Sequence, residues 1–85
     1  MTVIEIDFNG VKETYPCVLK QANEIDECEE GKIVVLCLKN GEVYTGVFKG
    51  IDDDDEDVML ESLNKKHTIG LKTYWIKEFY EVEKN

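Results

Sequence analysis

Three consecutive polar residues, Lys65, Lys66 and His67, carry the chemistry in this chain that best suits a binding site. A lysine ammonium is a mobile cation that can meet a phosphate, and a histidine ring can stack on a base or donate a hydrogen bond. The same residues also fit a polar turn that leads into a strand. We take them as candidate binding residues and keep the turn as the alternative.

A run of six acidic residues, 52–57, is the second feature with chemical potential. Neighbouring carboxylates repel each other unless they are solvated, bound to a metal or paired with a basic partner. No glycine follows in the pattern of a calcium loop, so no metal site is assigned. We expect a solvated loop, and the alternatives are a basic protein partner or a cation held by Asp53, Asp54, Asp55 and Asp57.

Catalytic patterns are missing from the sequence. His67 is the single histidine and has no nucleophile beside it, and there is no glycine-rich phosphate loop. Cys17, Cys28 and Cys37 are an odd number at spacings that fit neither a disulfide framework nor a zinc site, which favours buried reduced thiols. We therefore expect a protein that is not an enzyme and has no cofactor.

The net charge of −9 is unevenly distributed along the 85 residues. Residues 1–31 contain eight acids and two lysines, and residues 52–61 contain seven acids, whereas the remaining segments are mildly basic. Arginine is absent, so no guanidinium fork can bind a phosphate or carboxylate. Any anion site must use lysine, histidine or backbone donors.

The length allows one domain, and no apolar run approaches the roughly 18 residues of a membrane span. The chain starts with Met-Thr-Val-Ile-Glu-Ile-Asp, which lacks the basic start and apolar stretch of a signal peptide. We expect no contact with membranes and a cytoplasmic location.

The first 31 residues predict a hairpin and a short helix. Residues 3–8 alternate in polarity, Asn9-Gly10 is a strong turn signal, and a return strand over 11–15 pairs Phe8 with Val11 and Asp7 with Lys12. Pro16 places the chain after it at a sheet edge or outside the sheet. Residues 20–31 fit one or two helical turns, with Asn23 as the N-terminal cap and Gly31 as the stop.

The remaining chain predicts strands. Residues 33–38 are apolar on both faces, Asn40-Gly41 is a second turn, and residues 43–51 form a strand with Val43, Val47 and Ile51 on one face. Gly46 and Gly50 lie on the other, aromatic face, where missing side chains let a strand bend. Further strands are expected over 58–63 and 67–71, and residues 71–82 fit a strand or a helix. The aromatic residues favour core or subunit interface over base stacking, namely Tyr44, Phe48, Trp75, Phe79 and Tyr80.

Together these signals predict a mainly β chain of one domain: a hairpin extension over 1–19, a short helix over 20–31 and a small, strongly bent five-stranded barrel over 32–82. One combination of motifs is shared with a known family. Leu38-x-Asn40-Gly41, Gly46 and Asp52 follow the spacing of the first motif of the Sm/LSm superfamily, and Lys66-His67-Thr68-Ile69 resembles the second motif of its bacterial Hfq branch.

The resemblance implies rings of about five to seven copies that pair through their edge strands. It also implies single-stranded RNA bound near a pore lined by Lys66 and His67, and an Asp52 that holds its loop through backbone hydrogen bonds. The chain departs from the family where bases are read, since Asp53-Asp54 and Asp57 are acidic and Ile69 replaces an arginine. Two hypotheses follow: an RNA-binding ring using Lys65, Lys66 and His67, or an Sm-like scaffold that holds a basic protein through its acidic loop.

Overall fold

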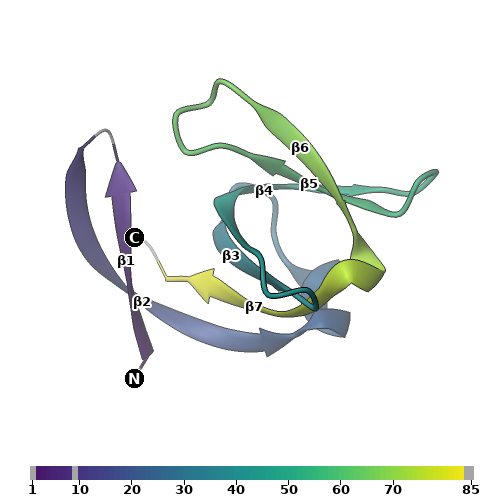
Figure 1. Cartoon of the computed structure of the whole chain (residues 1–85), viewed down its shortest axis with the longest axis horizontal. Coiled ribbons are helices and arrows are strands. Elements are labelled where there is room, and N and C mark those ends of the chain that lie inside the picture. Colours follow the sequence, from purple (N-terminus) through teal and green to yellow (C-terminus); the bar gives the residue numbers. More distant parts are fainter. Residues whose placement is uncertain (1, 9, 84–85) are drawn as a thin grey trace.

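The computed structural model describes residues 2–8 and 10–83, which form one antiparallel sheet of seven strands (Figure 1). The order across the sheet is β1-β2-β7-β3-β4-β5-β6. The strands are β1 (Thr2–Phe8), β2 (Val11–Gln21), β3 (Ile33–Leu38), β4 (Val43–Asp52), β5 (Asp57–Glu61), β6 (Thr68–Lys72) and β7 (Ile76–Val82), and two 3₁₀ helices are η1 (Ala22–Glu27) and η2 (Thr73–Trp75).

The mainly β prediction is confirmed, but the closed five-stranded barrel is wrong. Strand β2 is eleven residues long and pairs with β7, so the hairpin extends the same sheet rather than standing apart from it. β1 and β6 lie at the two ends of the strand order and have no partner on their outer sides within the described chain. The sheet is therefore curved and open (Figure 1).

The predicted hairpin register is confirmed, with Asp7 opposite Lys12 and Phe8 opposite Val11. Asn9 lies outside the described residues. Of the two placements predicted for the chain after Pro16, the sheet edge is confirmed: residues 18–21 pair with β7 on one side and with no second strand among the described residues on the other. Pro16 lies opposite Val3 of β1, one residue before the pairing of β2 with β7 begins. Its missing N–H therefore removes no hydrogen bond to β7.

The predicted helix exists but is shorter than 20–31. Pairing with β7 keeps the chain extended through Gln21, so η1 starts at Ala22. The cap predicted at Asn23 is wrong: Gln21 is the N-cap, and its N–H donates to the Glu24 carboxylate at 2.7 Å. Gly31 lies beyond the helix with φ +95° and donates its N–H to the Phe48 carbonyl at 2.8 Å, so it turns the chain into β3.

Both faces of β3 are buried, as its sequence predicts, because each face contacts a different core. The main core combines β3 to β7 with Ile25 of η1, and consists of Ile25, Val34, Leu36, Leu38, Phe48, Val58, Leu60, Leu71, Ile76 and Phe79. The second core is where the N-terminal hairpin packs on the outer face of the sheet, and consists of Ile6, Cys17, Ile33 and Val82.

Strand β4 bends where the sequence places glycines. A Cβ on Gly46 would lie 2.5 Å from the Glu61 carbonyl oxygen, so β5 approaches the β4 backbone closely at this point. The ladder between β4 and β5 shifts register between Phe48 and Ile51, and Gly50 there has φ +103°. The shift brings Ile51 against the main core beside Phe48, so the predicted placement of Ile51 with Val43 and Val47 is wrong.

The ambiguous tail is mostly strand. β7 lies between β2 and β3, which explains its β-branched and aromatic residues, and Ile76, Phe79 and Val82 are buried on its two faces. The single turn of η2 joins it to β6 and leaves Tyr74 and Trp75 exposed. Over the described residues, no helix has the length and apolar composition needed to cross a membrane.

Candidate functional site

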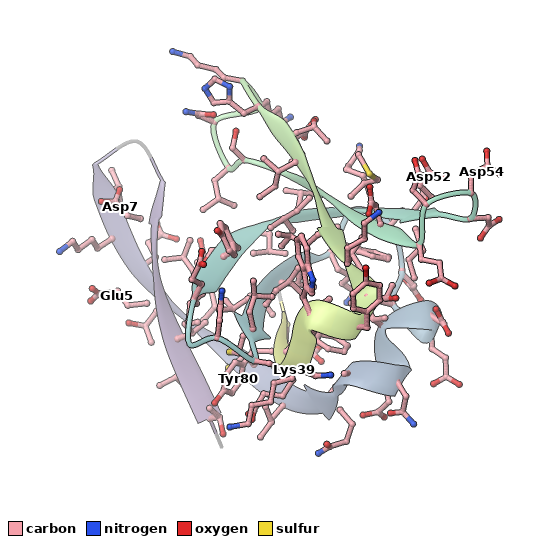
Figure 2. The ribbon with its side chains drawn as sticks, turned by 45° about the vertical axis from the view of Figure 1, so that its right-hand side comes forward. Glu5, Asp7, Lys39, Asp52, Asp54 and Tyr80 are labelled. Atoms are coloured by element: carbon pink, nitrogen blue, oxygen red, sulfur yellow. The ribbon has the colours of Figure 1, made fainter. Side chains whose placement is uncertain are left out.

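The acidic run forms an ordered loop between β4 and β5. Asp52 accepts a hydrogen bond from the Asp54 N–H at 3.0 Å, which is the backbone contact predicted for Asp52. Lys72 of β6 clamps the loop, because its Nζ lies 2.8 Å from Asp57 Oδ1 and donates to the Asp55 carbonyl at 2.9 Å. The hydrogen bond and charge of Asp57 raise the pKa of Lys72. Figure 2 shows Asp52 and Asp54 on this loop, away from the hairpin.

Carboxylates from two distant segments meet beside this loop. Asp26 of η1 lines a cavity of about 500 Å³ together with Asp53 and Glu56 of the loop. Asp26 and Asp53 also line a neighbouring cavity with Glu30. All four carboxylate residues are exposed. We call this surface the acidic groove, with walls of Asp26, Glu30, Asp53 and Glu56 and an apolar floor of Ile25, Ile51 and Ile76.

A second cavity of about 400 Å³ adjoins the acidic groove, since both are lined by Lys39 and Tyr74. We call it the aromatic pocket: Leu38 and Leu71 are its buried residues, Tyr44, Tyr74 and Trp75 supply aromatic rings, and Lys39, Asn40 and Glu42 complete its lining. The Tyr74 and Trp75 rings meet edge to face with centroids 6.3 Å apart.

Sequence reasoning missed the aromatic pocket. Of the two places predicted for Trp75, the core is wrong, because Trp75 is 46% exposed, and the subunit interface stays a prediction; neighbouring Tyr74, for which the sequence gives no prediction, is 58% exposed. The signal that could have revealed it is the pair of adjacent aromatic residues in a segment that fits neither a strand nor a helix period. Two adjacent side chains in a tight turn cannot both face a core, so at least one of them is expected to be exposed.

The predicted cationic residues lie on a separate, ordered loop between β5 and β6, which we call the basic loop (residues 62–67). Asn64 Oδ1 accepts bonds from the Ser62 hydroxyl at 2.6 Å and the Lys66 N–H at 3.0 Å, and the His67 N–H donates to the Ser62 hydroxyl at 3.1 Å. Lys65 has φ +62°. These bonds fix the backbone while the side chains of Lys65, Lys66 and His67 stay exposed.

The acidic and basic loops are not brought together. They extend from opposite ends of β5, whose five residues span roughly 16 Å (Figure 1). Of the three candidate binding residues, Lys65 also lines a cavity of about 560 Å³, whose charged lining includes Lys32 and Lys49 as well as Glu29, Glu30 and Glu61. The acidic run therefore does not occupy the space around Lys66 and His67.

The two motif glycines have structural explanations. Gly41 has φ +93° in the turn between β3 and β4, where the Leu38 N–H donates to the Glu42 carbonyl at 2.8 Å. A side chain is disfavoured at such a φ. Gly46 is required by the close approach of β5.

The three thiols have chemistry suited to packing rather than catalysis. Cys17 is buried, Cys28 and Cys37 are half-buried, and all three are free. Burial raises the pKa of each thiol, and raises that of Cys28 to about 11, with the charge of Glu81 as a lesser cause. Within residues 2–8 and 10–83, no three histidine, cysteine or acidic side chains gather closely enough to hold a metal ion.

Comparison with known proteins gives no relative for this arrangement: no family model, curated protein or solved structure matches the chain.

Proposed function

We propose that this chain is an Sm-like module whose acidic groove binds a lysine- or arginine-rich segment of a partner protein. The Sm-like assignment is supported by a short helix followed by five antiparallel strands, with Gly46 at a close approach, Gly41 in a turn and Asp52 at the end of β4, where it accepts a hydrogen bond from its loop. The motifs follow one another in the order that the resemblance implies, and each lies on the kind of element that the resemblance implies for it.

The observation that carries the binding proposal is the meeting of acids from residues 26–30 and 53–56 over one apolar floor. Concave surfaces on which one sign of charge dominates, here four carboxylates against Lys39, concentrate the field and attract opposite charge. Lysine and arginine side chains can lay their alkyl stems on an apolar surface while the charged end meets a carboxylate. A groove with both features is complementary to a basic segment.

Binding of a fluorescent hepta-lysine peptide, measured by anisotropy at low and physiological salt, tests the proposal. The double variant Asp26→Asn with Asp53→Asn should weaken binding at least tenfold, because it removes two charges from the groove. The matched control is Glu5→Gln with Asp7→Asn, which removes two charges from the hairpin, far from the groove (Figure 2). Equal weakening by both variants would mean that net charge, not the groove, attracts the peptide.

A second candidate function, single-stranded RNA binding at the basic loop, is favoured by one observation. The loop backbone is fixed by its own hydrogen bonds and presents Lys65, Lys66 and His67 at the end of β5 opposite the acidic run 52–57. Pre-ordering of this kind reduces the entropy lost on binding.

Oligo-uridine binding tests the RNA candidate, with a log–log salt slope of about −0.7 for each phosphate neutralised. Lys66→Ala should lower the affinity, whereas Lys77→Ala, at a cation 68% exposed on β7, should not. Absence of binding at low salt eliminates this function.

A ring of copies, which the resemblance implies, would have to pair β6 of one copy with β1 of the next, because β7 already has β2 and β3 on its two sides. Charge supports this pairing, since β1 carries Glu5 and Asp7 and the basic loop leads directly into β6. Light scattering after gel filtration tests it, and a mass of 9.8 kDa at high concentration rejects it.

A further inference from the structure

We propose that the aromatic pocket receives one bulky apolar side chain, of the size of leucine or phenylalanine, from the same segment whose cations occupy the acidic groove. This inference rests on the proposed function and adds a second requirement to the partner. The partner segment must carry an apolar anchor within a few residues of its lysines or arginines.

The composition of the aromatic pocket selects an apolar guest. Leu38 and Leu71 are its buried members, and the exposed rings of Tyr74 and Trp75 stand beside them. Exposed tryptophan and tyrosine at a concave site are the residue types that most often dominate binding energy in protein interfaces. A volume of about 400 Å³ is ample for a large side chain.

The pocket is held in shape before any ligand arrives. The Lys39 N–H donates to the Trp75 carbonyl at 2.9 Å, which ties the turn after β3 to η2. Glu42 accepts hydrogen bonds from the Asn40 amide at 2.7 Å and from the Tyr44 hydroxyl. Because both walls are fixed to each other, little ordering remains to be done on binding.

Continuity with the acidic groove identifies the occupant as part of a basic peptide. Lys39 and Tyr74 line both cavities, so a chain that leaves the pocket enters the groove without crossing other surface. A nucleobase would fit the rings, but its phosphates would then face Asp26, Asp53 and Glu56 across the shared wall. Three carboxylates outweigh the one cation, Lys39, on this wall, so the net repulsion of phosphates favours the peptide.

Trp75 is the single tryptophan of the chain and therefore reports on the pocket directly. Two peptides serve as probes: six lysines around a central phenylalanine, and the same peptide with alanine at the centre. The phenylalanine peptide should bind at least tenfold more tightly, because its ring moves out of water into contact with the indole. The same contact removes water from the indole and should shift the Trp75 emission to shorter wavelength. Tyr74→Ala should weaken the phenylalanine peptide by a larger factor than the alanine peptide, because Tyr74 lines the groove as well as the pocket and only the phenylalanine peptide also loses its anchor contact. Val11→Ala, at a residue with the same 58% exposure on the hairpin, is the control.

The outcomes separate this inference from the proposed function. If both peptides bind equally, leave the Trp75 emission unchanged and are released by Asp26→Asn with Asp53→Asn, the groove is correct and the anchor is overturned. If neither peptide binds, the proposed function fails as well. If oligo-uridine, and neither peptide, quenches Trp75, the pocket takes a base and the anchor is again overturned. Circular dichroism of Tyr74→Ala confirms that any loss arises in a folded chain.

Discussion

Substitution of Gly46 by alanine tests the bend in β4, the strand that contributes residues to both the acidic groove and the aromatic pocket. The added Cβ would lie 2.5 Å from the Glu61 carbonyl oxygen and 2.8 Å from Leu60 Cγ. Carbon atoms in contact prefer about 3.5–4.0 Å, so β5 would have to move away by about 1 Å. The closest obstacle is backbone held in the β5–β6 ladder, and it cannot rotate aside as a side chain could.

The magnitude follows from two opposing terms. Overpacking of this kind costs about 1–3 kcal/mol, and a rigid obstacle places Gly46→Ala near the upper end. Alanine also restricts the unfolded chain, which returns about 0.4–1 kcal/mol. The net loss in the free energy of unfolding is about 2 kcal/mol. For a domain of this size, each kcal/mol lowers Tm by about 4–8 °C, so Tm should fall by roughly 10 °C or more.

Thermal unfolding followed by circular dichroism, with urea unfolding followed by Trp75 fluorescence, measures this loss. Gly41→Ala is the matched control, because a Cβ there meets open space and the cost of about 1 kcal/mol arises only from φ +93°. Gly46→Ala should therefore be the less stable of the two variants. If it unfolds within 2 °C (about the precision of such scans, and under 1 kcal/mol) of the unmodified chain, β5 does not cross β4 closely and the bend is incorrect.

Three further predictions concern the sites. Lys72→Met should speed amide hydrogen exchange in residues 53–57 relative to Lys77→Met, because it removes the ion pair with Asp57. This ion pair raises the pKa of Lys72 above 10.5, so the stability that the pair contributes is complete below pH 10.5 and is lost as the pH rises through the folded-state pKa. Cys28, with a pKa of about 11 against 9.0 for a free thiol, should react with iodoacetamide at pH 8 about a hundredfold more slowly than a peptide thiol. Lys39→Glu should tighten hepta-lysine binding, because it replaces the cation on the wall of the groove with a carboxylate; unchanged or weaker binding would mean that the peptide does not reach this wall.

Local signals in the sequence predicted what local physics controls. Gly10 and Asn40-Gly41 mark two turns, the pairing of Asp7 with Lys12 follows the predicted register, and the apolar run over 33–38 indicated burial on two faces. Each of these depends on neighbouring residues or on one pair of strands. The short loop before β6 and its cations were likewise visible as a polar turn.

What the sequence did not reveal depends on contacts between distant segments. The open sheet follows from β2 pairing with β7, 57 to 65 residues away, and no local pattern encodes that choice. The shift of Ile51 to the main core depends on a bulge at Gly50. The acidic groove likewise needs η1 to lie beside the loop after β4, so its acids look like two unrelated charge runs in the sequence.

The pairing of the acidic residues separates those that hold the fold from those that line the groove. Asp57 is paired with Lys72, and Glu81 with Lys20 and Lys32, so these carboxylates stabilise strands. Within residues 2–8 and 10–83, no ion pair joins a lysine to Asp26, Glu30, Asp53 or Glu56.

Unpaired acids that crowd one surface repel each other and lower the stability of the compact state. The repulsion among the carboxylates of the groove therefore lowers the free energy of unfolding, and a bound basic ligand would reduce this repulsion. The double variant Asp26→Asn with Asp53→Asn should then raise Tm while it weakens hepta-lysine binding, and the peptide should raise the Tm of the unmodified chain more than that of the variant. A variant that loses both stability and binding would show instead that these carboxylates hold the groove together, and that their charge is structural.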